Sequence, residues 1–81
     1  MKATVLIRPK EGILDPQGEA VGEALRTLGF AVTSARVGRI VDVELETDDP
    51  VEAEAALAAM SRDLLANPTI ESFTIEIEES A

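Results

Sequence analysis

The octapeptide EGILDPQG, residues 11–18, joins a strand-like apolar run to an amphipathic helix. Asp15 can accept hydrogen bonds from the free amides of the first helical turn, and Pro16 suits the first helical position, where no amide donor is needed. Gly18 and Gly22 lie one turn apart on the same face, and each costs the helix about 1 kcal/mol relative to alanine. Capping does not account for the two glycines. They favour close approach of another backbone, unless they are simply tolerated in a tight loop.

The elements expected on either side of this loop are a strand and a helix. Residues 2–8 form a strand that is apolar on both faces, as in the centre of a sheet, and Pro9 ends it because it cannot donate to a ladder. The helix covers residues 16–28 and stops at Gly29, which tolerates left-handed backbone. Its expected apolar stripe, at spacings of three and four, consists of Val21, Ala24, Leu25 and Leu28.

Residues 32–46 have an extended pattern that is interrupted at Gly38. Gly38 and Arg39 could form a two-residue type II′ hairpin turn, which would give two strands. Gly38 could equally be a bulge in one long bent strand that reaches a neighbouring subunit. The sequence leaves both possibilities open.

The second helix has clear boundaries. Asp49 is its expected N-cap and Pro50 its first residue, and the pair Asn67-Pro68 ends it. A last strand follows over residues 70–78, with apolar residues alternating with polar ones. The buried stripe of the second helix is expected to consist of Val51, Ala53, Leu57, Met60 and Leu64.

This order of elements predicts an α+β fold in a single domain, residues 1–81. The expected architecture is a two-layer sandwich, an antiparallel sheet with two helices on one face. It is the ferredoxin-like βαββαβ arrangement if the hairpin forms, and βαβαβ with one long bent strand otherwise. Phe30 and Phe73 are the only aromatic residues, so the core is small and aliphatic. Such cores gain stability against another subunit, and we expect dimerisation to extend the sheet.

Composition excludes several classes of function. The sequence has no Cys, His, Trp or Tyr, so disulfides, zinc sites of the Cys/His kind and a histidine base are ruled out. The net charge is +2 over residues 1–40 and −11 over residues 41–81, which opposes binding to nucleic acid. No apolar stretch approaches the roughly 20 residues of a membrane span, and no signal peptide is evident. We therefore expect a cytoplasmic protein with no catalytic residue. We also expect no metal site, because the adjacent carboxylates of Asp48 and Asp49 suit capping of the second helix.

The pattern KEGILDPQG, at residues 10–18 and followed by a helix that ends in Leu-Gly, resembles the PurS family. That family is the small subunit of phosphoribosylformylglycinamidine synthase in purine biosynthesis. Two further stretches match in order, RVGR at residues 36–39 and LLANP at residues 64–68. The chain departs from the family pattern at Arg8-Pro9 and in its alanine-rich second helix.

The resemblance implies a non-catalytic subunit of a complex that converts formylglycinamide ribonucleotide, glutamine and ATP to formylglycinamidine ribonucleotide. A glutaminase partner releases ammonia, and a large synthetase partner uses ATP and magnesium. The small subunit, as a homodimer or homotetramer, joins the two and aids ammonia transfer without a cofactor of its own. We therefore assign to fold and interface the residues Gly12, Asp15, Pro16, Gln17, Gly18, Gly22, Val37, Gly38, Leu65, Asn67 and Pro68.

An alternative from another class is a regulatory module of the ACT type. Such modules also have the βαββαβ order and often dimerise. They bind amino acids at the dimer interface near the first strand-to-helix loop, which residues 11–18 could mimic.

Overall fold

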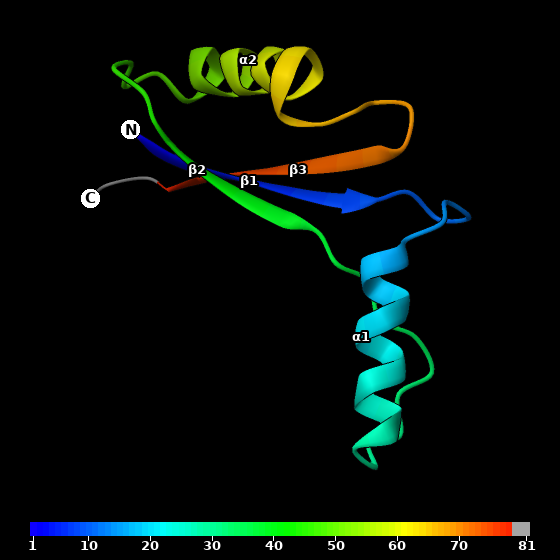
Figure 1. The fold of residues 1–81 in the computed structure, drawn as a ribbon. Helices are drawn as coiled ribbons and strands as arrows, with labels where there is room; N and C mark the ends of the chain where they lie inside the picture. Colours follow the sequence, from blue (N-terminus) through cyan, green and yellow to red (C-terminus); the bar gives the residue numbers. More distant parts are fainter. Residues whose placement is uncertain (79–81) are drawn as a thin grey trace.

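The computed structural model describes residues 1–78, which form a three-stranded sheet and two main helices (Figure 1). The strands are arranged in the order β2-β1-β3, and both neighbouring pairs are antiparallel. The first strand therefore lies in the centre, as its two apolar faces predict. The elements in chain order are β1 (Lys2–Pro9), α1 (Pro16–Thr27), β2 (Arg39–Glu44), α2 (Pro50–Met60), the short π-helix η1 (Ser61–Leu65) and β3 (Glu71–Glu78).

The core lies between α2 and one face of the sheet (Figure 1). Alternate residues of β1 point toward α2, because successive side chains of a strand face opposite ways. Leu57 of α2 meets them and is fully buried. The buried apolar residues are Ala3, Val5, Ile7, Ala53, Leu57 and Ala66.

The expected stripe of α2 is only partly correct. Val51 is exposed because it precedes the buried Ala53 by two residues, which places it about 200° around the helix. Leu64 is 84% exposed because the helix widens after Met60. The Ala66 amide donates to the Ser61 carbonyl at 2.9 Å, five residues back, so the turn holds one extra residue. Ala66 takes the buried place instead.

The α+β class is confirmed, but the two helices do not share one face of the sheet. α1 starts beyond the end of β1 and extends away from the sheet, on the side opposite α2 (Figure 1). The chain then returns beside α1 through residues 30–37, which we call the return segment. The buried residues of α1 are Gly18 and Gly22. By contrast, Val21 is 43% exposed and Leu28, just after the helix, is 73% exposed. The predicted apolar stripe of α1 therefore has no sheet beneath it.

Gly38 marks the point where the chain crosses close to β1 on its way from the return segment into β2. A type II′ turn needs positive φ at its first central residue, and among the described glycines only Gly12 (80°) and Gly29 (99°) have it. The chain therefore passes from the return segment into β2 without a hairpin. A Cβ at Gly38 would overlap the carbonyl oxygen of Ile7 and lie 3.2 Å from its carbonyl carbon. The glycine serves this close crossing. Neither alternative raised by the sequence is found, because no hairpin forms and the expected long bent strand is reduced to β2 (Arg39–Glu44).

The result is an elongated molecule. The described Cα atoms extend over 47 × 30 × 14 Å, with a radius of gyration of 15.8 Å. A compact domain of this length has a radius of gyration of about 12 Å. We call α1 together with the return segment the arm, because it projects from the body formed by the sheet and α2.

We predict that Leu57→Ala lowers the free energy of unfolding by about 2–5 kcal/mol, because it empties a fully buried site under the sheet. Leu64→Ala, in η1 directly after α2, is the matched control. Its side chain is 84% exposed, so the change should stay within about 0.5 kcal/mol. Urea unfolding at one fixed protein concentration measures both. Equal losses of stability in the two variants would mean that Leu64 is buried like Leu57, which would contradict the π-turn at residues 61–65.

Candidate functional site

We call the three stretches that carry the family resemblance, residues 10–18, 36–39 and 64–68, the signature stretches. Asp15 connects the first two of them. Its carboxylate accepts a hydrogen bond from the Gly18 amide at 3.0 Å through one oxygen, and from the Val37 amide at 2.9 Å through the other. These two bonds, from Val37 first and then Gly18, hold the pKa of the Asp15 carboxyl below its ordinary value. The predicted N-cap is thus confirmed, and the same side chain also ties the start of α1 to the end of the return segment.

Gly18 and Gly22 admit the chain's own backbone. A Cβ on Gly18 would collide with the Asp15 carboxylate and lie 2.5 Å from the Ala35 carbonyl oxygen. At Gly22 the nearest atom of Ala35 would be an ordinary 3.6 Å away. The expectation that these glycines meet another subunit is corrected, because the return segment of the same chain covers them.

Arg39 links the second and third signature stretches. Its guanidinium forms a two-pronged ion pair with Glu71, at 2.6 and 3.0 Å, and also donates to the Leu65 carbonyl. Arg39 lies on β2 and Glu71 on β3, so the pair spans the end of β1 between them. The side-chain bond from Arg39 is the main cause of the lowered pKa of Glu71, and a bond from the Asn67 amide adds to it.

The loop before β3 is held by similar contacts. The side-chain oxygen of Asn67 accepts a hydrogen bond from the backbone amide of Thr69 at 3.1 Å. The backbone amide of Asn67 donates to the carboxylate of Glu71 at 2.8 Å. Lys10 joins this loop to the end of β1: its amide donates to the Ile70 carbonyl and its ammonium group to the Pro68 carbonyl. The three signature stretches therefore meet at one end of the sheet, which we call the junction.

The predicted residues occupy different parts of this junction. Asp15, Val37, Leu65 and Asn67 take part in its hydrogen bonds. Other signature residues shape the chain: Gly12 has positive φ and Pro16 opens α1. Gln17 lines a surface hollow of about 230 Å³.

Sequence reasoning missed three contributors, Lys10, Arg36 and the Arg39–Glu71 pair. Arg36 donates to the Lys10 carbonyl at 2.6 Å. One signal was available for Arg39: it falls on the otherwise apolar face of its strand, where an arginine needs an acidic partner. The remaining contacts depend on the path of the return segment, which no local pattern reveals.

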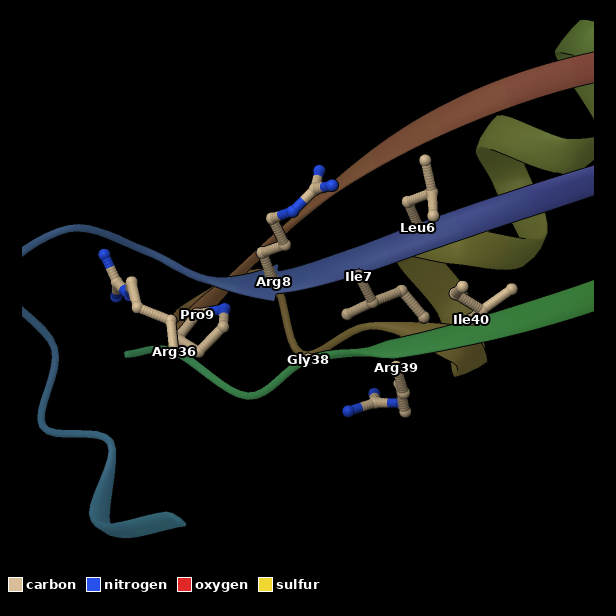
Figure 2. A pocket seen from close by; sticks show the side chains of 8 residues that line it. All are labelled: Leu6, Ile7, Arg8, Pro9, Arg36, Gly38, Arg39 and Ile40. Atoms are coloured by element: carbon tan, nitrogen blue, oxygen red, sulfur yellow. The ribbon is translucent and has the colours of Figure 1, made fainter. Parts of the chain in front are cut away.

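An arginine-lined hollow lies at the same end of the sheet. It measures about 420 Å³ and is shown with its eight lining residues in Figure 2. Arg8 and Arg39 point to opposite sides of the strands, and Arg36 extends from the return segment (Figure 2). Since these guanidinium groups diverge, the hollow does not gather them around one anion.

Exposed apolar side chains lie on the arm and directly beside it. Leu14 is 71%, Leu28 is 73% and Phe30 is 59% exposed. Val21 lies between them on α1 and is also exposed. Val21 and Leu28 are seven residues apart, about two helical turns, so these two side chains lie on the same face at the exposed side of α1.

Two further searches of the described part of the chain concern metal-ligand clusters and membrane-spanning helices. Residues 1–78 contain no group of three or more acidic, cysteine or histidine side chains that could hold a metal ion. No helix within this range has the length and apolar character needed to cross a bilayer. The clearly perturbed pKa values belong to Asp15, Arg39 and Glu71, and all three groups are engaged in the junction.

Comparison with known proteins gives one consistent match. The family model of PurS, phosphoribosylformylglycinamidine (FGAM) synthase, matches residues 2–79. The PurS subunit of FGAM synthase from Archaeoglobus fulgidus is 42% identical over 76 residues, covering 93% of this chain and 95% of the relative. The crystal structure of Methanocaldococcus jannaschii PurS has a TM-score of 0.86 at 33% identity, covering 99% and 98% of the two chains. A chain in the structure of PurLQS from Thermotoga maritima has a TM-score of 0.85 at 25% identity, covering 93% of each chain.

We predict opposite effects for two glycine substitutions on α1. Gly18→Ala should lower the free energy of unfolding by about 1–3 kcal/mol, because the new methyl group meets backbone that cannot yield. Gly22→Ala should raise it by up to about 1 kcal/mol, because the methyl group fits and alanine favours the helix. Thermal and urea unfolding at equal protein concentration compare them. If both variants gained stability, the close approach at Gly18 would be disproved.

We also predict a pH-dependent contribution from Asp15. Because its pKa is lowered by folding, its stabilisation is complete above the ordinary value of 3.8 and is lost as the pH falls through the lower folded value. The difference in stability between the wild type and Asp15→Asn should therefore shrink as the pH falls below about 4. Urea unfolding at several pH values measures it, with Glu54→Gln as a control for removing one exposed charge. A difference that stayed constant with pH would contradict the role of the carboxylate.

Proposed function

Because the chain belongs to the PurS family and is a subunit of FGAM synthase in purine biosynthesis, we propose that it acts by assembly rather than by chemistry. On this proposal it joins a large synthetase subunit to a glutaminase subunit. The complex converts formylglycinamide ribonucleotide, glutamine and ATP to formylglycinamidine ribonucleotide. This chain supplies no reacting group to either half of the reaction.

The observation that carries this proposal is the use of the signature residues within the junction. The two oxygens of Asp15 bind two backbone amides, and Arg39 and Glu71 bind each other and nearby backbone. Groups whose hydrogen-bonding atoms are engaged in this way stabilise the folded structure of the junction. The free surface beside them is the apolar face of the arm, which suits contact with another protein.

The proposal extends to partners and cofactors. The solved PurLQS assembly of Thermotoga maritima supports a complex of three kinds of subunit. We propose that this chain enters such a complex as a homodimer or homotetramer and needs no cofactor. ATP and magnesium then act on the synthetase subunit, and the assembled subunits shield ammonia in transit. The site of action is the cytoplasm, where ATP-dependent biosynthesis takes place.

Membership of the PurS family also decides between the two functional classes raised by the sequence. The family model covers residues 2–79, and the loop at residues 11–18 forms part of the junction. An ACT-type amino-acid site at that loop is therefore not needed to account for its sequence.

We predict that omitting the chain from purified synthetase and glutaminase subunits abolishes most glutamine-supported formation of formylglycinamidine ribonucleotide. Free ammonia should restore part of the rate, because the synthetase retains its own chemistry. Product formation with glutamine or with ammonium chloride measures both outcomes. Equal glutamine-supported rates with and without the chain would refute the proposed function.

Substitution in the junction provides the control for this assay. Asp15→Asn should reduce the rate by weakening assembly, so a higher concentration of the variant should recover it by mass action. A loss that persisted at saturating variant would show that the carboxylate takes part in the chemical step. Glu54→Gln, on the exposed side of α2, should behave as wild type.

A further inference from the structure

We infer that the hollow shown in Figure 2, which we call the basic hollow, binds an acidic segment of another subunit of the complex. An aspartate or glutamate of that segment pairs with Arg8, and an apolar side chain beside it packs against Leu6 and Ile40. The inference rests on the proposed function, because the segment belongs to the synthetase or the glutaminase subunit.

The first argument is the charge of the basic hollow. Its eight lining residues include three arginines, Arg8, Arg36 and Arg39, and none of the eight is acidic. The whole sequence has 16 acidic residues and 7 Lys and Arg residues, so positive charge gathers here against the overall balance of the chain. A surface of this sign attracts a partner that carries carboxylates.

Arg8 is the arginine of this group that is free to bind a partner. Arg39 is paired with Glu71, and Arg36 donates to the Lys10 carbonyl. The exposed guanidinium of Arg8 forms no ion pair and no side-chain hydrogen bond with any residue in the described range 1–78. Its binding capacity is therefore unused within the chain.

The acidic residues on this face of the sheet lie too far away to neutralise Arg8. The residue opposite Arg8 on β3 is Ser72, whereas Asp42 and Glu76 are opposite Thr4. Thr4 is four residues from Arg8 on the same strand, which is about 13 Å. This separation exceeds the Debye length, roughly 8 Å at physiological ionic strength. The charge of Arg8 is thus left for a partner.

The second argument is the apolar surface beside Arg8. Leu6 and Ile40 are directly opposite each other on β1 and β2, and Leu6 and Arg8 project from the same side of β1 with Ile7 turned to the other side (Figure 2). α2 covers the other face of the sheet, so Ile40 remains 63% exposed. An arginine beside exposed apolar side chains is typical of protein–protein interfaces, where both are buried together.

The third argument is that the basic hollow is already formed in the free chain. β1 is paired on both sides, which fixes Leu6 and most of the strand that carries Arg8. Gly38 passes close to the Ile7 carbonyl and holds the start of β2 against β1. Binding to such a preformed surface costs little conformational entropy.

A protein segment fits the basic hollow better than a small anion does. The guanidinium groups diverge (Figure 2), so they do not form the convergent set of donors that a bound phosphate needs. Sites for small molecules also bury most of the ligand surface, whereas Ile40 lies largely in water. A protein surface can pair with Arg8 and cover Ile40 at the same time.

A binding experiment with the purified synthetase and glutaminase subunits tests the role of Arg8. Arg8→Glu should weaken binding roughly 10- to 100-fold, because it removes a charge-assisted bond and places like charges together. Arg8→Lys should retain part of the affinity, because it keeps the charge but not the two-pronged geometry. Arg62→Glu, at an exposed arginine of η1, is the matched control and should bind as wild type. Titration of the fluorescently labelled chain measures the dissociation constants.

The salt dependence of binding provides a second measurement that does not need a charge reversal. Arg8→Gln removes the charge, so its affinity should fall less steeply than that of wild type as ionic strength rises. Urea unfolding checks that each variant is folded. Wild-type affinity and wild-type salt dependence in Arg8→Gln would refute the inference, as would a folded Arg8→Glu variant that bound like wild type.

A photo-crosslink locates the partner segment in the assembled complex. The photoreactive residue p-benzoylphenylalanine replaces Ile40, and mass spectrometry identifies the peptides joined to it. We expect a synthetase or glutaminase segment in which Asp or Glu lies beside an apolar residue, and replacing that acid by Lys should restore the binding of Arg8→Glu. Crosslinks confined to a second copy of this chain, or to a segment without an acid, would overturn the inference. A probe at Glu54 should not reach the same segment.

The wild-type chain separates the failure of this inference from the failure of the proposed function. A wild type that bound neither subunit would refute the proposed function and, with it, the inference. A wild type that bound them while Arg8→Glu bound equally well would refute the basic hollow alone.

Discussion

The two hydrogen bonds that the Asp15 carboxylate accepts determine how the rest of the chain is arranged. One secures the first turn of α1 and the other holds Val37, 22 residues further along the chain. A neutral side chain at this position could not satisfy both amides equally well, since charged acceptors form the stronger bonds. The carboxylate therefore fixes α1 and the return segment as one piece, which joins the sheet at the close crossing of Gly38 with Ile7.

Local signals in the sequence predicted the elements and their ends. The caps at Asp15 and Asp49, the stop at Gly29 and the central position of β1 are all present in the structure. Each depends on a residue and its immediate neighbours, which is why a single sequence reveals it. The resemblance carried by three short stretches also identified the family correctly.

The sequence did not reveal how distant segments meet. Periodicity placed Leu64 in the core, but a π-turn shifts the helix by one residue and exposes it. The glycines of α1 indicated a close approach without showing whether the neighbour belongs to the same chain. Arg39 and Glu71 are 32 residues apart, and their pairing depends on the strand order. Such features follow from tertiary geometry, which a local pattern does not encode.

The central position of β1 also affects how the protein emerges during synthesis. Lys2 pairs with both Glu44 and Glu78, so the first strand made is the last to gain its second neighbour. At about 5–20 residues per second the ribosome takes roughly 2–7 seconds to extend the chain between those two partners. During that interval Val5 and Ile7 lack half of the sheet that later surrounds them. The nascent chain thus leaves β1 without its second neighbour until β3 has been made.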